Sequence, residues 1–379
     1  MSLIPDFYLV QIAFAPLPPP YSTALKSIEV ETAIGEASMF RLSFELSRNA
    51  FGDYDALAVD IFRPNVPIRI SVALGGSPVP QTLINGYVRE ARLSGSNEPG
   101  GSRLEVVGMD ALGTLMGTIE QPFIWPNLPD SEVVRVIFGK YGIVPSFVIP
   151  TPPTRTMQDT TTTQRVSDAR YLLQLARRSA YELFIQPDPL IGVDNGFFRP
   201  PLPVQPPQGV LSLDFGTQTN LNSFHVSNDM LRPTSVVSLS SDPLSRAPIP
   251  AIAPVATEPP LGLEPTLLRV LPPPIERPAE TDAANPAEVQ SQAMARVNET
   301  SRAVSASGEV NGIKFKRPLR VGMPVLVRGA GRQMSGLYYV THVTHSISQD
   351  EYTQSFRAWR NAVGLTGAEV FIDPLAAAS

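Results

Sequence analysis

The chain has 379 residues, enough for roughly two or three domains with a substantial buried core. Its net charge is −5, which disfavours a protein that grips the phosphates of nucleic acid. It has no cysteine, which excludes disulfides, cysteine-ligated metal centres and thiol catalysis. The 40 prolines favour a β-rich fold with long ordered loops.

The N-terminal stretch, MSLIPDFYLVQIAFAPLPPP, contains an apolar run without a basic lead, and prolines end it early. This pattern predicts a strand and no signal peptide. No apolar run approaches the roughly 18–20 residues that cross a bilayer, so no membrane span is expected.

Strict alternation of apolar and polar residues marks the first part of the chain as antiparallel β structure. LKSIEVET, INGYVREARLSG and SRLEVVGMD are further predicted strands, with a turn at 94–101. We therefore expect residues 1–118 to form a first β domain, either a small sandwich or a barrel. In the two clearest strands, the predicted core positions are Phe40, Leu42, Phe44 and Leu46, and then Ile68, Ile70, Val72 and Leu74.

Helical signals follow, and residues 119–198 are predicted to form an α+β lobe. LPDSEVVRVIFGKYGI indicates a helix with Pro129 in its first turn and Gly142 as its C-terminal cap. A second helix begins after Ser167, a plausible N-cap, and the strand YELFIQP follows it. VPSFVIP is another predicted strand. The predicted apolar stripes are Val133, Val136, Ile137 and Tyr141 in the first helix, and Ala169, Leu172, Leu173, Ala176 and Ala180 in the second.

Residues 243–286 carry 12 of the 40 prolines without any period, which predicts an extended insert that crosses a surface or stays mobile. A helix is expected from about Pro286, so that insert and helix together occupy 243–304. MPVLVRG, GLYYVTHVTHSIS and YTQSFRAWR then predict three strands. We expect 199–242 and 305–365 to belong to a second β domain, and 366–379 to be a tail.

The two β regions share an order of features. FRPNVPIRISVALGG and FKRPLRVGMPVLVRGAG both place prolines before a short alternating strand and glycines after it. A long strand, a turn and a third strand follow in both regions. Two similar β units are one interpretation, and a chance likeness between two antiparallel meanders is the other.

Few residues suggest chemistry. His342 and His345 have a spacing that suits a metal on a helix, but on a strand it points them to opposite faces. In GAGRQMSG, Met334 occupies the place of the third glycine of a dinucleotide-binding loop, so a hairpin turn is expected. We predict no catalytic, cofactor-binding or metal-binding residue, and no cofactor.

Two alternatives stay open. A cell-wall glycan hydrolase would use a pair of acids from the set near the second helix. A carbohydrate- or receptor-binding protein would use Trp359, or Trp125, as an exposed stacking platform. The candidate acids are Asp159, Asp168, Glu182 and Asp188.

Several motifs, taken in order, resemble the late-control D or baseplate hub family of contractile phage tails and related injection systems. They are VVGMDALGTLM, DSEVVRVIFGKYGI, SDARYLLQLARRSAYELFIQPD and the closing RVGMPVLVRGAGRQMSGLYYVTHVTHSISQDEYTQSFRAWRNA. The resemblance covers about 1–240 and 286–365. Its two most specific pieces are the helix–strand S-D-x-x-x-L-x-x-L-A-x-x-x-x-Y and the closing hairpin G-x-Y-x-V-x-x-V-x-H. The resemblance implies no catalytic role for either.

The resemblance implies a non-enzymatic homotrimer whose chains each supply two similar β-barrels, so that six barrels form a ring. Such a ring adapts a sixfold tail tube to a threefold spike and encloses a channel. The implied partners are the tail tube protein, a separate spike protein and other baseplate proteins, with nucleic acid or cargo only passing through the lumen. The implied location is the tail baseplate of a virion or injection particle, after synthesis in the host cytoplasm.

Overall fold

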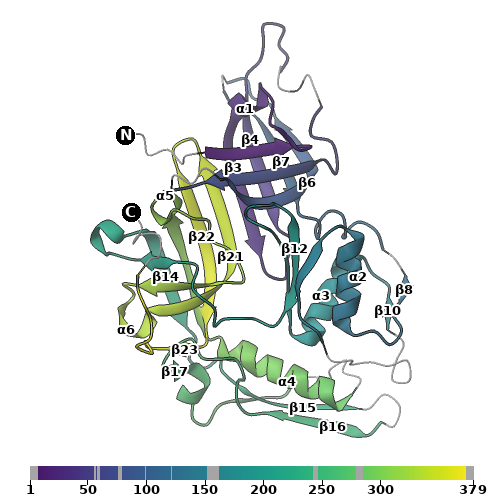
Figure 1. Cartoon of the computed structure of the whole chain (residues 1–379), viewed down its shortest axis with the longest axis vertical. Helices are drawn as coiled ribbons and strands as arrows, with labels where there is room; N and C mark the ends of the chain where they lie inside the picture. Colours follow the sequence, from purple (N-terminus) through teal and green to yellow (C-terminus); the bar gives the residue numbers. More distant parts are fainter. Residues whose placement is uncertain are drawn as a thin grey trace.

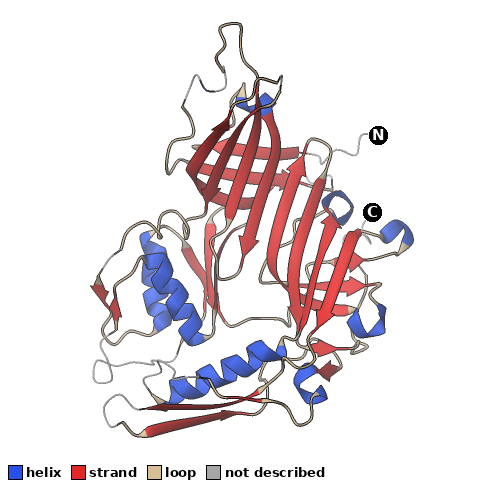
Figure 2. Cartoon of the chain, turned by 180° about the vertical axis from the view of Figure 1, so that it is seen from behind, coloured by secondary structure: helices blue, strands red, loops and turns tan. Residues whose placement is uncertain are grey.

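The computed structural model describes residues 7–54, 57, 60–75, 79–98, 100–120, 122–151, 162–241, 246–278 and 285–372. The chain is β-rich, as predicted. One large sheet, antiparallel except where β13 meets β20, runs through the molecule, and a few helices flank it (Figures 1 and 2). No helix in the described part of the chain is long and apolar enough to cross a membrane.

The N-terminal half of this sheet has the strand order β3-β4-β7-β6-β5-β1-β2. The alternation predicted for β4 is confirmed, because Phe40 and Leu42 are completely buried and the residue between them is not. In β5 the alternation holds only up to Ile70, because Ser71 and Ala73 are buried as well. Phe40, Leu42 and Ile70 share one core with the inner faces of the neighbouring strands. The elements are β1 (Phe7–Ile12), β2 (Ala15–Pro16), α1 (Tyr21–Ala24), β3 (Leu25–Ala33), β4 (Met39–Leu46), β5 (Pro67–Ala73), β6 (Gln81–Ser94) and β7 (Ser102–Met109).

The C-terminal half has the order β14-β19-β22-β21, with β20 and then β13 beyond β21. The three strands predicted near the C-terminus are β20, β21 and β22. The elements are β13 (Val210–Ser212), η2 (Gly216–Gln218), β14 (Leu221–Asn228), β19 (Val304–Asn311), α5 (Gly312–Phe315), β20 (Pro324–Arg328), α6 (Gly331–Met334), β21 (Gly336–Ser348), β22 (Tyr352–Arg360) and β23 (Ala362–Val363).

Strands β21 and β3 join the two halves. Their antiparallel register places Thr344 opposite Glu31 and His345 opposite Val30. The long, curved sheet that results is visible from behind in Figure 2. Neither half closes into a barrel among the described strands, so the predicted barrel form is not confirmed.

The two halves repeat one order of strand pairing. β3-β4-β7-β6-β5-β1 in the first matches β14-β19-β22-β21-β20-β13 in the second. The long strand of each half, β6 or β21, pairs with the preceding strand along its first part and with the following strand along the rest. The β1–β5 pair is antiparallel and the β13–β20 pair is parallel, so this outermost contact differs.

Two register shifts occur at matching places in the two halves, whereas a third, between Ile70 and Ser71 in the β5–β6 pair, has no counterpart in the β20–β21 pair. The β6–β7 register shifts between Val88 and Glu90, and the β21–β22 register shifts between Val340 and His342. A tyrosine precedes each shift, in the sequences YVRE and YVTH. A second shift falls at Leu25/Ser27 in β3 and at Leu221/Ser223 in β14, within LKSIEV and LNSFHV. Bulges are specific local features of a sheet, so their recurrence aligns the two halves residue by residue.

The α+β lobe packs two helices beside a small sheet of order β11-β12-β9 (Figure 1). One predicted core position is wrong: Val136 is 54% exposed, whereas Val134 and Phe138 are buried. The buried face of α2 is thus rotated about the helix axis relative to the predicted stripe. The elements are β8 (Phe123–Ile124), α2 (Asp130–Lys140), β9 (Val144–Val148), β10 (Thr163–Gln164), α3 (Asp168–Ser179), β11 (Glu182–Pro187) and β12 (Asp194–Arg199).

The described part of the Pro-rich region is an ordered layer, contrary to the extended or mobile insert that we expected. Strand β16 pairs with β15, and helix α4 lies along both (Figure 1). Ile249, Ala251 and Ala253 alternate into a core with Val289 and Val297 of the helix. The elements are β15 (Ser235–Ser241), β16 (Pro248–Ala253), β17 (Glu264–Pro265), η3 (Thr266–Arg269), β18 (Ile275–Glu276) and α4 (Pro286–Ser301).

Candidate functional site

One face of the large sheet is polar across both halves, and we call it the polar face. Strand registers align its side chains in rows, because directly opposed residues project on the same side of a sheet. One row crosses five successive strands and contains Ser223, Glu309, Ser355, Thr344 and Glu31. The polar face therefore continues without interruption from the C-terminal half into the N-terminal half.

In the N-terminal half, ion pairs cover the polar face. An Nη atom of Arg41 lies 2.8 Å from Glu29, and its Nε atom lies 3.1 Å from Glu105. The Nε atom of Arg92 lies 2.7 Å from Glu90, and its hydrogen bonds lower the pKa of that carboxyl. Exposed pairs of this kind add little stability. They place positive and negative charges side by side on this part of the polar face.

In the C-terminal half, the polar face carries mainly hydroxyl and imidazole groups. His225, Ser307, Arg357 and His342 are directly opposed on four successive strands and line a hollow of about 290 Å³. Burial, reinforced by Arg357, lowers the pKa of His342, so this imidazole is neutral at pH 7. This arrangement provides a polar surface on which hydroxyl and imidazole groups lie beside the guanidinium of Arg357.

The two histidines of the H-x-x-H motif are not brought together. His342 lies on the polar face, whereas His345 is 2% exposed on the opposite face, where its Nδ1 lies 2.8 Å from the hydroxyl of Tyr352. Within the described ranges, no group of three His, Asp or Glu side chains is placed to hold a metal ion. The glycine-rich segment lies in the β20–β21 connection, where it forms the short helix α6.

The candidate acids have separate structural partners, except Asp159, which lies outside the described residues. Asp168 accepts hydrogen bonds from Lys140 Nζ at 2.7 Å and Gln164 Nε2 at 2.6 Å. Burial opposes ionisation of Asp168, but these bonds outweigh it and hold its pKa below the ordinary value. Asp188 accepts from the backbone N–H groups of two residues in the following turn, at 2.9 and 2.8 Å.

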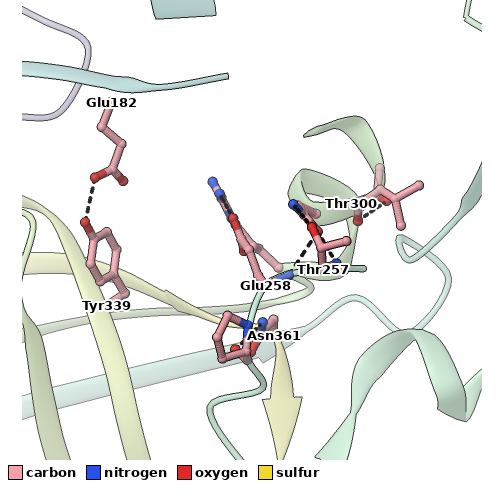
Figure 3. A network of polar contacts seen from close by, with 10 residues as sticks. Glu182, Thr257, Glu258, Thr300, Tyr339 and Asn361 are labelled. Carbon is pink, nitrogen blue, oxygen red and sulfur yellow. Dashed lines mark hydrogen bonds and ion pairs between the residues drawn. The ribbon is translucent and has the colours of Figure 1, made fainter. Parts of the chain in front are cut away.

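Glu182 belongs to a polar network that ties the lobe, the C-terminal β half and the insert together (Figure 3). The hydroxyl of Tyr339 donates to its carboxyl at 2.6 Å. Burial raises the pKa of Glu182 to about 7, although this hydrogen bond and two nearby arginines act in the opposite direction. Elsewhere in the network, Arg302 pairs with Glu258, and the backbone N–H of Leu261 donates to Asn361 at 2.9 Å.

Neither tryptophan is exposed as the stacking hypothesis requires. Trp359 is 8% exposed, and the guanidinium of Arg302 lies 4.5 Å from its ring centroid. Tyr339 packs against the same ring, with centroids 5.1 Å apart. Trp125 is 9% exposed and donates from Nε1 to Gln164 at 3.1 Å. Both rings are packing residues here.

Most of the polar face was not singled out in the sequence. Its strands β14 and β19 were not predicted individually, because serine, glycine and histidine dilute their alternation. The signal that could have found them is the short repeat L-x-S-x-x-V, which occurs in β3 from Leu25 and in β14 from Leu221.

Comparison with known proteins shows which solved structures have a similar fold. No family model matches the sequence, and no curated protein does either. A tail protein from Neisseria meningitidis MC58 matches at 13% identity with a TM-score of 0.60, covering 94% of this chain and 97% of that one. A 43 kDa tail protein of prophage MuSo2 from Shewanella oneidensis matches at 12% identity with a TM-score of 0.61, covering 93% and 98%.

A third similar structure is an E. coli protein described as a component of the type VI secretion system with structural similarity to the T4 bacteriophage tail proteins gp27 and gp5. It matches at 12% identity with a TM-score of 0.56, covering 93% of this chain and 76% of that one. The chain therefore shares the fold of these tail and secretion-system proteins, which confirms, at the level of the fold, the resemblance found in its sequence.

Proposed function

We propose that the chain is a structural baseplate hub of a contractile phage tail or injection system. In this proposal it is a homotrimer, and each chain contributes two similar β modules. Three chains then supply six modules, so that a threefold assembly presents a sixfold ring. The ring meets the tail tube protein on one side and a separate spike protein on the other.

The observation that carries this proposal is the repeated strand order with register shifts at matching positions. A chance likeness between two meanders explains alternating strands. It does not explain two bulges in register, because a bulge is a specific departure from regular pairing. The domain boundaries that we propose remain 1–118 for the first module, 199–242 with 305–365 for the second, and 119–198 for the lobe.

The polar face fits the lining of such a channel. Its ion pairs are balanced and His342 is neutral, so passing nucleic acid or protein cargo meets no strong electrostatic attraction. We propose that this face lines the lumen, and that other baseplate proteins contact the outer elements. In this proposal the protein acts within a virion or an injection particle.

Light scattering on the purified chain tests the trimer, with and without a spike protein. A chain that remains monomeric in both conditions contradicts the proposal. A particle structure at the tube–spike junction would give the copy number directly.

The non-enzymatic part of the proposal has its own test. A glycan hydrolase would clear cell-wall glycan in a zymogram, and Asp168→Asn or Glu182→Gln would abolish the clearing. We expect no clearing with the wild-type chain, since both carboxyls are engaged in internal hydrogen bonds.

A further inference from the structure

Two strands of the large sheet, β14 and β6, leave a stretch of backbone edge without a partner among the described strands. Among the described strands, β14 pairs only with β19. In the N-terminal half, β5 pairs with β6 only over residues 81–87, so one edge of residues 90–94 has no partner strand. We call residues 90–94 the β6 tip. Open strand edges present unpaired backbone donors and acceptors, so they are natural sites for strand addition.

The contact between β21 and β3 shows what each open edge would meet. The register shifts align the two halves, so that His342 corresponds to Glu90 and Ser223 corresponds to Ser27. The segment of β21 that pairs with β3 thus corresponds to the β6 tip, and β3 corresponds to β14. Within one chain, β21 pairs with β3, but the equivalent contact between the β6 tip and β14 is not formed.

We propose that β14 of one copy pairs antiparallel with the β6 tip of a second copy, repeating the β21–β3 contact between chains. This inference rests on the proposed hub function, and it names the surfaces that join the copies. The register transfers directly. Thr344 opposite Glu31 becomes Arg92 opposite Ser227, and His345 opposite Val30 becomes Leu93 opposite Val226.

Burial gives independent support for this register. His345 is 2% exposed and Val30 is 0% exposed where the internal contact exists. The corresponding Leu93 is 51% exposed, and Val226 is half-buried. The proposed pairing places the two apolar side chains opposite each other. A slip by one residue would place Leu93 opposite Ser227 or His225 and turn one strand over.

The proposed contact joins two different edges, the β6 tip of one copy and β14 of another, and every copy has both edges. Such head-to-tail contacts form a closed ring when the rotation between copies returns to the start. Three copies would then alternate internal and intermolecular contacts of the same kind. The polar face would continue across every junction, because Arg92 and Ser227 both lie on it.

The absence of cysteine makes a direct test possible. In the full chain, Arg92→Cys combined with Ser227→Cys places two thiols opposite each other across the proposed junction. Opposed Cα atoms in antiparallel strands lie about 4.5–5.5 Å apart, within the roughly 4.4–6.8 Å that a disulfide spans. We expect oxidation to give covalent dimers and trimers in a non-reducing gel.

Two control pairs fix the interpretation. Thr344→Cys with Glu31→Cys is the internal equivalent and should form a disulfide within one chain, without a change in mass. Arg92→Cys with Ser223→Cys places the second thiol four residues along β14, and should not cross-link. A trimer in light scattering that shows no 92–227 cross-link, or cross-links equally at 92–223, overturns the edge contact but leaves the trimer standing. A persistent monomer overturns both.

A charge substitution tests the same contact without relying on disulfide geometry. Leu93→Asp introduces a carboxylate on the apolar side of the proposed junction, and we expect self-association to weaken at least tenfold. Leu239→Asp is the matched control, because Leu239 is 61% exposed on β15, away from both edges. If Leu93→Asp associates as tightly as the wild type, the proposed contact is wrong.

Discussion

Glu182 predicts an unusual dependence of stability on pH. The residue is 8% exposed, its carboxyl accepts a hydrogen bond from Tyr339, and burial raises the pKa of this carboxyl from 4.5 to about 7. In the unfolded chain the same carboxyl ionises near its ordinary pKa. Between these two values the folded chain holds a proton that the unfolded chain has released. The stabilisation is therefore complete at acidic pH and is lost as the pH rises towards 7.

The size of the effect follows from the shift. One pKa unit corresponds to about 1.36 kcal/mol, so a change from 4.5 to about 7 corresponds to about 3 kcal/mol in the free energy of unfolding. Glu182→Gln keeps an oxygen that can accept the hydrogen bond from Tyr339 but cannot ionise. The variant should lose this part of the pH dependence, and it should gain stability relative to the wild type as the pH rises.

The measurement is urea unfolding of both proteins from pH 4.5 to pH 8, monitored by tryptophan fluorescence. Other buried carboxyls, such as Asp110, also change protonation in this range, but they contribute equally to both proteins and cancel in the difference. If the wild type and the Glu182→Gln variant give parallel curves, the buried neutral carboxyl is refuted as the source of the effect.

Three further predictions concern packing. Leu42→Ala, at a completely buried position of β4, should lower the free energy of unfolding by about 2–5 kcal/mol in urea titration. Arg178→Leu removes the partner of Asp130, which is 3% exposed, and should cost about 3–5 kcal/mol. Adding Asp130→Leu should restore only part of the loss, because Arg178 also lies 3.8 Å from the buried Glu288. In a Trp125→Phe background, acrylamide should quench Trp359 only weakly, with or without glycan; strong quenching would revive the stacking hypothesis.

The sequence predicted the strands whose alternation is strong. In β4 and β5, large apolar residues occupy every second position, and one face is buried as expected. Period alone was less informative in α2, because apolar residues occur on several sides of that helix. Packing of α2 within the lobe buries Val134 and Phe138 and leaves Val136 in solvent. The local sequence does not show which face of the helix makes these contacts.

The Pro-rich region was misread for a related reason. In PIPAIA the buried positions do alternate, but the prolines between them suggested an irregular segment. Tertiary packing against α4 supplies the order that local propensity does not. The polar face was only partly predictable, because its continuity depends on the β21–β3 register, a contact between segments that lie far apart in sequence, as His342 opposite Ala33 shows.

The prolines of β16 have a consequence for how the molecule avoids unwanted association. Strand β16 is the outer strand of its small sheet, and Pro248 and Pro250 both fall on it, opposite Ser241 and Leu239. Proline has no N–H to give, so along a paired edge strand its nitrogen faces outward. A strand approaching β16 therefore finds donors missing at alternate positions. The prolines therefore disfavour edge-to-edge pairing at β16. Strand β14 has no proline, so its free edge can pair with a partner strand.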